Sequence, residues 1–286
     1  MNTYKKQLSN DQNFSINCRG KLISLEKPLI MGILNLTPDS FSDGGKFNQE
    51  KSALYHAEKM ISEGASIIDI GPQSTNPNSK QITAKEETER LGKVISQLKK
   101  EFPETLISVD TFYTDTVQYA ADEGMDIIND ISGGQFDINM FETVAKTGLP
   151  YILMHINPSF GQMHDKIKYQ DIILNINRFF SEKVCELTEL RVHDIILDPG
   201  FGFGKTIEDQ YQMTEEAEYF GFGKWPLLIG ISRKSFIYKS VGKSPLEIVE
   251  ETQNLHLKLL HKGAKILRVH DVAETKKTID LFLGNR

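Results

Sequence analysis

Short apolar runs, each ended by a polar residue, alternate with amphipathic stretches along most of the chain. Each run is too short for a helix and suits a buried parallel strand. Eight such runs with a helical stretch after each predict an α/β fold, a (βα)8 TIM barrel. The polar residues that end the runs are Asn35, Asp69, Asp110, Asn129, His155, Asp198, Ser232 and His270.

Between the runs, apolar residues recur at the helical spacing of about 3.6 residues. Ala53, Ala57 and Met60 follow this spacing after the first run, and the long stretch from Ile172 to Leu187 follows it after the fifth. Residues 84–100 carry many charges, so we expect one solvent-facing helix there.

The start of the chain stands outside this repeat. Residues 14–25 form two short apolar stretches around Arg19-Gly20, which predicts a short N-terminal β-hairpin. Residues 1–13 are polar and are expected to form a flexible tail without an apolar signal region. No linker divides the rest, so we expect a single domain over residues 14–286.

Composition narrows the class of protein. The 286 residues carry a net charge of −6, which gives no support for a nucleic-acid partner. Cys18 and Cys185 show no metal-ligand spacing and are expected to be inert thiols. No apolar run reaches transmembrane length, so we expect a soluble, cytoplasmic protein without a membrane partner.

Residues 226–235 give the strongest single indication of a ligand. Their apolar run breaks at Ser232, a good N-cap residue, and Arg233 and Lys234 follow at once. Free N–H groups and the positive end of a helix dipole would meet two cations there, which predicts an anion site. The alternative interpretation is a basic turn on the surface.

The ends of the strands should form the active site, as in other barrels of this class. Aspartates at an apolar barrel mouth need hydrogen-bond donors, and a flat heterocycle with several N–H groups would supply them. The other half of the rim is expected to be cationic and to hold phosphate. Its predicted members are Lys205, Arg233, Lys234, Arg268 and His270.

Histidines and nucleophiles are less informative. His155 is as consistent with a satisfied histidine at a strand end as with a functional one. No Ser–His or Cys–His arrangement stands out, so no protein nucleophile is expected. The histidines expected at the surface or on helices are His56, His164, His193, His256 and His261.

From about Pro28 to its C-terminus, the chain resembles the dihydropteroate synthase family. The shared motifs include residues 31–45, 108–111, 197–205, 232–235 and 268–271, and their joint occurrence in this order is highly specific. The resemblance implies condensation of 6-hydroxymethyl-7,8-dihydropterin diphosphate with p-aminobenzoate and release of pyrophosphate, in folate biosynthesis. It also implies Mg²⁺ as cofactor and a homodimer formed through barrel helices.

The resemblance further implies roles for individual residues. The pterin would be bound by Asp110, Asn129, Met154, Asp198, Gly230 and Lys234. The diphosphate would be bound by Asn35, which is also the expected Mg²⁺ ligand, and by Thr75, Arg268 and His270. The p-aminobenzoate site would include Phe41, Thr75, Pro77, Phe203, Lys234 and Ser235. The implied catalytic residues are Asp110, Asp198, Lys234 and Arg268.

The second loop departs from the family. It reads Ser74-Thr-Asn-Pro-Asn78, with Asn76 where the family has arginine. Sulfonamide-resistant members have similar loops, so we expect reduced sulfonamide sensitivity. Two alternatives stay open: a methyltransferase of the methyltetrahydrofolate type, which would need no diphosphate clamp, and a non-catalytic pterin-binding paralogue.

Overall fold

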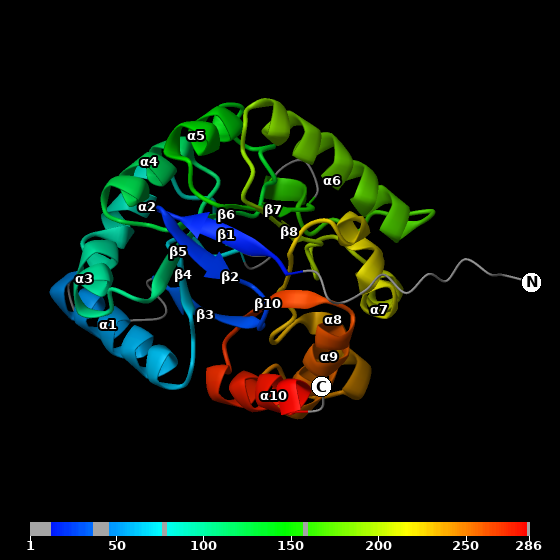
Figure 1. Ribbon diagram of the computed structural model, residues 1–286. Helices are drawn as coiled ribbons and strands as arrows, with labels where there is room; N and C mark the ends of the chain where they lie inside the picture. Colours follow the sequence, from blue (N-terminus) through cyan, green and yellow to red (C-terminus); the bar gives the residue numbers. More distant parts are fainter. Residues whose placement is uncertain (1–12, 37–45, 76–78, 157–159, 285–286) are drawn as a thin grey trace, which may run out of the picture.

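The computed structural model describes residues 13–36, 46–75, 79–156 and 160–284. Eight parallel strands close into a barrel, in the order β10-β3-β4-β5-β6-β7-β8-β9, with helices on the outside (Figure 1). The predicted TIM barrel is therefore confirmed. The strands are β3 (Leu29–Asn35), β4 (Ile67–Gly71), β5 (Leu106–Asp110), β6 (Ile127–Asp130), β7 (Tyr151–Met154), β8 (Ile195–Asp198), β9 (Leu227–Ile229) and β10 (Ala264–Val269).

Helices follow the strands around the barrel. They are α1 (Lys46–Ser62), α2 (Ala84–Leu91), α3 (Val94–Glu101), α4 (Thr114–Asp122), α5 (Met140–Thr147), α6 (Ile172–Glu189), α7 (Ile207–Glu215), α8 (Ser235–Val241), α9 (Val249–His261) and α10 (Val272–Gly284). In the part of the chain that the structure describes, the 3₁₀ segments η2 (Phe160–Gln162) and η3 (Ala217–Gly223) lie in connections. Among the described residues, no helix is long and apolar enough to cross a membrane.

An apolar layer fills the barrel interior at the end that lies against the N-terminal hairpin, and each strand contributes one side chain to it. These side chains are Met31, Ile67, Leu106, Ile127, Ile152, Ile196, Leu228 and Ile266. Because side chains alternate along a strand, the residues two positions further on point inward as well. Those residues include Asp69, Asn129, Asp198 and Arg268. The apolar layer thus forms a dry floor beneath a polar layer at the C-terminal ends of the strands.

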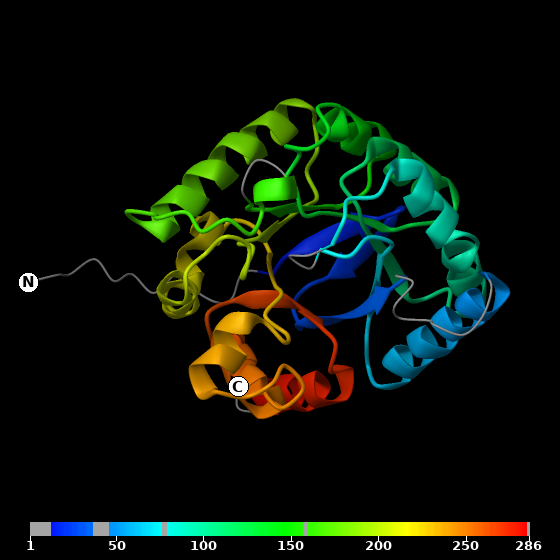
Figure 2. The same cartoon turned by 180° about the vertical axis from the view of Figure 1, so that it is seen from behind.

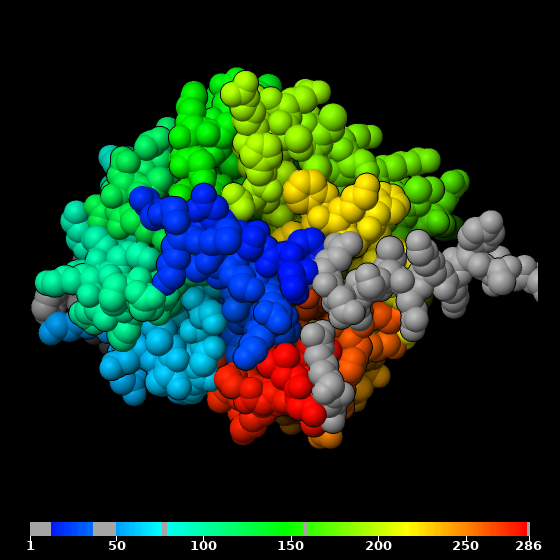
Figure 3. All heavy atoms as spheres, in the orientation of Figure 1, coloured from blue at the N-terminus to red at the C-terminus, as the bar shows by residue number. Residues whose placement is uncertain are grey.

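The predicted hairpin, β1 (Ser15–Cys18) paired with β2 (Lys21–Ser24), closes the opposite end of the barrel. Ile16, Cys18 and Leu25 are buried against the apolar layer. Figure 3 shows the hairpin spread over this end of the molecule. Burial raises the pKa of the Cys18 thiol to about 12, and both cysteines are free. Ligand access is therefore left to the other end, where the loops after the strands gather (Figure 2).

The prediction of one solvent-facing helix over residues 84–100 is wrong. The segment forms two helices, α2 and α3, which separate at Gly92, where the backbone has a φ of 47°. Both helices bury one face against the core, with Leu91, Val94 and Leu98 fully inside. The charges in the sequence concealed this narrow apolar stripe.

Glu87 is a buried carboxyl group within this stripe. Its Oε2 accepts a hydrogen bond of 2.5 Å from the hydroxyl of Thr111, the residue after β5. Among the described residues, Oε1 has no hydrogen-bond partner. Burial raises the pKa of Glu87 from its ordinary value of 4.5 to about 7. The folded chain therefore holds this proton over a pH range in which the unfolded chain releases it.

We expect Glu87→Gln to stabilise the chain more as the pH rises. In the wild type, the stability that comes from the retained proton is complete below about pH 4.5 and is lost as the pH rises through about 7. The neutral amide removes this loss, so the gain in unfolding free energy at pH 8 should exceed that at pH 5 by roughly 2 kcal/mol. Urea unfolding at both pH values measures it. Glu89→Gln, exposed on the same helix, is the control, and equal gains at both pH values would contradict the prediction.

Candidate active site

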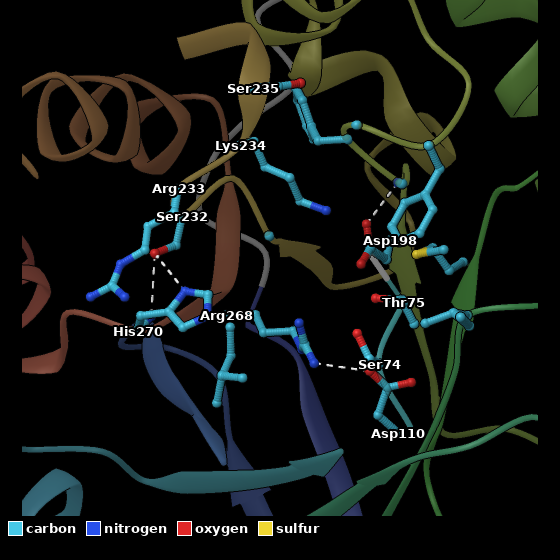
Figure 4. Close-up of a pocket in the computed structure, with 18 of the residues that line it drawn as sticks. Ser74, Thr75, Asp110, Asp198, Ser232, Arg233, Lys234, Ser235, Arg268 and His270 are labelled. Carbon is cyan, nitrogen blue, oxygen red and sulfur yellow. Dashed lines mark hydrogen bonds and ion pairs between the residues drawn. The ribbon is translucent and has the colours of Figure 1, made fainter. Parts of the chain in front are cut away.

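A cavity of about 630 Å³ opens at the C-terminal ends of the strands, where the sequence predicts the active site. Figure 4 shows side chains from several strands and loops converging on it. Of the predicted site residues, the structure brings together here Asn35, Thr75, Asp110, Asn129, Met154, Asp198, Phe203, Gly230, Lys234, Ser235, Arg268 and His270. The other two, Phe41 and Pro77, lie outside the described residues, as does Asn76.

One side of the cavity is lined by hydrogen-bond acceptors. Asp110 and Asn129 are paired in register on β5 and β6, which places their side chains next to each other. Asp198, at the end of β8, accepts a hydrogen bond of 2.7 Å from the N–H of Gly200 through Oδ1. Burial raises the pKa of Asp110 to about 7, against the opposing effect of Arg268, and it raises the pKa of Asp198 as well.

Arg268 lies over this acidic side rather than apart from it. Its Nη2 donates to Asp110 at 2.9 Å, and its Nε donates to Asp69 at 2.6 Å (Figure 4 shows the first contact). Burial lowers the pKa of Arg268, but the two carboxylates outweigh it and raise the pKa above its usual value. The arginine therefore joins the predicted heterocycle side of the cavity to the predicted phosphate side.

Lys234 points into the cavity between Asp198 and the loop after β8 (Figure 4). Its Nζ lies 4.4 Å from the centre of the Phe203 ring, which is cation–π distance. Burial and the neighbouring Arg268 lower the pKa of Lys234 to about 8. The ammonium and the aromatic ring together form a wall for a flat ligand.

The prediction that Ser232 caps a helix is wrong. Lys234 is the N-cap residue of α8, and it makes no side-chain cap hydrogen bond. Arg233 has a positive φ of 58°, which turns the chain before the helix begins. Its guanidinium pairs with Asp271 at 2.6 Å, so this cation is already neutralised within the protein.

Ser232 instead pairs with His270. The prediction that the chain has no Ser–His arrangement is therefore also wrong. The serine hydroxyl accepts from the backbone N–H of His270 and lies 3.2 Å from its Nδ1. We assign the hydroxyl proton to that contact, which leaves the proton of the ring on Nε2. Burial lowers the pKa of His270 to about 4, so the ring is neutral at pH 7 and too weakly basic to activate a nucleophile.

Three predicted rim residues, Lys205, His155 and Asp69, do not line the cavity. The ammonium of Lys205 is buried and donates to the carbonyls of Gly200, His155 and Phe203 at 2.7, 3.3 and 3.3 Å. Lys205 thus holds the loop after β8 together, and burial lowers its pKa to about 7. The ring of His155 packs against Tyr169 and Phe179, but its buried Nδ1 has no hydrogen-bond partner among the described residues. His155 is therefore packed away from the cavity without being the satisfied histidine that the structural interpretation expects.

The residues of the cavity wall that sequence reasoning missed include His164 and Gln73. The sequence predicts His164 at the surface or on a helix, but its ring stacks on Phe203 at 5.6 Å and its Nε2 lies 2.8 Å from the carbonyl oxygen of Thr75. Gln73 accepts a hydrogen bond from the N–H of Ile82. Neither residue ends a strand, so the rule that found the other members could not find them.

Comparison with known proteins shows the family of the chain. The sequence model of the family described as "pterin binding enzyme" matches residues 31–270. Dihydropteroate synthase of Escherichia coli K12 is 39% identical over 259 residues, which cover 90% of this chain and 91% of that protein.

Solved structures agree. The Yersinia pestis dihydropteroate synthase with a sulfonamide drug superposes with a TM-score of 0.88 at 37% identity, over 96% of this chain and 99% of that one. The Xanthomonas albilineans enzyme with 4-aminobenzoic acid gives a TM-score of 0.88 at 32% identity, over 96% and 98%.

The chain therefore belongs to the family of pterin-binding enzymes. Within it, the chain belongs with the dihydropteroate synthases, the transferases of folate biosynthesis, as the sequence motifs predict. The methyltransferase and the non-catalytic paralogue are not favoured by these relatives.

Proposed function

We propose that the chain condenses 6-hydroxymethyl-7,8-dihydropterin diphosphate with p-aminobenzoate and releases pyrophosphate. The observation that carries this proposal is that three acceptor side chains and two cations line the same cavity. The acceptors are Asp110, Asn129 and Asp198, and the cations are Lys234 and Arg268. A pterin ring offers the N–H donors that the acceptors need, and its diphosphate offers the negative charge.

The pterin would lie over the floor of the cavity. Asp110, Asn129 and Asp198 would accept from its N–H groups, and Lys234 would donate to its ring. Gly230 suits a flat ligand, because among the described residues a Cβ there would come within 4 Å of Arg268 alone, at 3.8 Å. Met154 would cover the opposite edge of the ring.

The diphosphate would lie toward Asn35, Thr75, Arg268 and His270. The neutral ring of His270 can donate from Nε2. Arg268 carries a permanent charge, and its Nη1, which takes part in neither the Asp69 nor the Asp110 contact, can donate to a phosphate oxygen. His270 and Arg268 can therefore both donate hydrogen bonds to an anion at neutral pH.

Mg²⁺ fits this end of the site only as a partner of the diphosphate. Among the described residues, no group of three or more His, Cys, Asp or Glu side chains could hold a metal ion. The exposed Asn35 offers its Oδ1, which faces the end of β4, 3.1 Å from where a Cβ at Gly71 would lie. One protein oxygen with phosphate oxygens and water is a usual Mg²⁺ environment. The bound ion would supply positive charge for the departing diphosphate.

The reaction follows from these positions. The bond between the pterin methylene and the diphosphate oxygen breaks, and the electron pair leaves with pyrophosphate. The amine nitrogen of p-aminobenzoate forms the new bond to the methylene and loses a proton to solvent. Arg268 and Lys234 stabilise the leaving negative charge, while Asp110 and Asp198 favour the electron-poor ring. No covalent intermediate with the protein is needed.

The p-aminobenzoate would lie at the outer end of the cavity, against Phe203, Lys234 and Ser235. His164 extends this wall and connects it to Thr75. Phe41 and Pro77 stay predictions for this site. Reduced sulfonamide sensitivity also stays a prediction, since it depends on Asn76, outside the described residues.

A homodimer through the barrel helices is also proposed. Large apolar side chains are partly exposed on α6, α7 and α8: Leu174 by 45%, Tyr211 by 38% and Val241 by 45%. Burial of such side chains against a second copy would be favourable. Sedimentation of the chain tests this, and a monomer at micromolar concentration would contradict it. The cytoplasmic location stays a prediction from the sequence.

A turnover assay with both substrates tests the proposed reaction. We expect dihydropteroate and pyrophosphate in equal amounts, only when both substrates and Mg²⁺ are present, and loss of turnover in excess chelator. Turnover that persists in chelator would remove Mg²⁺ and the role of Asn35. Pterin binding without any turnover would favour the non-catalytic paralogue instead.

A further inference from the structure

Asp69 is a buried carboxylate in the polar layer of the barrel, behind the side chains that line the active-site cavity. It lies on β4, points into the barrel and is completely inaccessible to solvent. It does not line the cavity, so a substrate there would not touch it. Its contacts are with two residues that the proposed function places against the substrate, Asn129 and Arg268.

The first contact fixes the side-chain amide of Asn129. The Nδ2 of this asparagine donates to both oxygens of Asp69, at 3.3 and 3.1 Å. A carboxylate can only accept, so the NH₂ end of the amide must face Asp69. The Oδ1 of Asn129 is therefore turned toward the cavity, where it acts as a third acceptor beside Asp110 and Asp198.

The second contact fixes the guanidinium of Arg268. Its Nε donates to Asp69 at 2.6 Å, while its Nη2 reaches Asp110 at 2.9 Å. Asp69 thus holds the inner edge of the guanidinium in place. The Nη end remains at the level of the cavity, where a ligand can reach it.

We propose that Asp69 is a positioning residue of the synthase, which sets the acceptor orientation of Asn129 and holds Arg268 at the cavity. The inference rests on the proposed function, because it concerns recognition of the pterin diphosphate. It predicts that the hydrogen-bonding direction at position 69, rather than its volume, controls pterin binding.

Asp69→Asn inverts this direction with almost no change of shape. The oxygen of the new amide can accept from Arg268, and its NH₂ then faces Asn129. Asn129 must turn over to accept, and its own NH₂ would face the N–H donors of the pterin. We expect the KM for pterin diphosphate to rise about 10- to 100-fold, because opposed donors leave a buried hydrogen bond unmade. The KM for p-aminobenzoate should stay within about twofold.

The double variant Asp69→Asn with Asn129→Asp restores the pattern with the partners exchanged. The amide at position 69 can donate to the carboxylate at position 129 and still accept from Arg268. The second oxygen of that carboxylate again faces the cavity as an acceptor. We expect the KM for pterin diphosphate in the double variant to be at least tenfold lower than in Asp69→Asn. A merely structural role of Asp69 would not produce this recovery.

Asp130→Asn is the matched control. Asp130 is equally buried, on β6, but it bonds to Tyr151, Ser132 and Gly134 and does not line the cavity. Asp130→Asn should lower the unfolding free energy without changing the KM for either substrate.

The experiment measures kcat, both KM values, calorimetric binding of pterin diphosphate and urea unfolding for the three variants and the unchanged chain. A selective loss of pterin binding in Asp69→Asn, recovered in the double variant, supports the proposal. Kinetics of Asp69→Asn that match those of Asp130→Asn, or a double variant without recovery, would overturn it. An unchanged chain that neither binds pterin diphosphate nor turns it over would overturn the proposed function itself.

Discussion

Asp110→Ala should weaken binding of pterin diphosphate by roughly 30- to 4,000-fold while the barrel stays folded. Removing one partner of a buried charged hydrogen bond leaves the other partner unpaired, at a cost of roughly 2–5 kcal/mol, and 1.4 kcal/mol is a tenfold change in Kd. Here the unpaired groups would be N–H donors of the pterin. Isothermal titration calorimetry with pterin diphosphate gives the Kd directly.

The fold should tolerate this change because Arg268 keeps its second carboxylate, Asp69, at 2.6 Å. Asp110→Asn is the conservative control: it retains one acceptor oxygen and the volume, so its loss should be smaller. Circular dichroism and urea unfolding confirm that both variants fold. An unchanged Kd in a folded Asp110→Ala would remove Asp110 from the pterin site.

The sequence could predict the barrel and most of the cavity because both depend on local patterns. Apolar runs ended by polar residues identify the strands and their C-terminal ends, and parallel strands bring those ends to one rim. Asp110, Asn129 and Asp198 were found in this way, although they lie on three different strands. Their chemical roles came from the resemblance to a family and not from the pattern.

Whether a side chain points into or out of the barrel depends on a single residue of register, and this is where pattern reasoning fails. Met154 and His155 are neighbours in the chain, yet Met154 lines the cavity and His155 packs on the outer side against Phe179 of α6. An end-of-strand rule cannot separate them, because strand ends are uncertain by a residue or two.

The charge states of the rim residues could not be predicted from the sequence either. Lys205, Arg233 and His270 were grouped with Arg268 as cations for phosphate. In the fold, Lys205 is bound by three carbonyls, Arg233 is paired with Asp271, and His270 is neutral. Burial and long-range partners decide such states, and a linear pattern contains neither.

The loop after β8 depends on a glycine where two constraints coincide. Gly200 has a φ of +69°, and a Cβ there would lie 2.1 Å from the backbone oxygen of His155. Its N–H donates to Asp198, and its carbonyl accepts from Lys205. Any movement of Gly200 therefore disturbs a pterin acceptor and the loop that carries Phe203 together.

Gly200→Ala should lower the unfolding free energy by roughly 2–5 kcal/mol and reduce kcat/KM at least tenfold for both substrates. The left-handed backbone accounts for roughly 1–2 kcal/mol of this loss and overpacking against fixed backbone for roughly 1–3 kcal/mol. Gly148→Ala separates the two contributions, since Gly148 has nearly the same φ, +64°, but an added Cβ there would have no atom of the described residues within 4 Å. Urea unfolding and steady-state kinetics of both variants measure the effects. Gly148→Ala should lose only the backbone contribution and keep full activity, and equal losses in the two variants would show that the contact with His155 is unimportant.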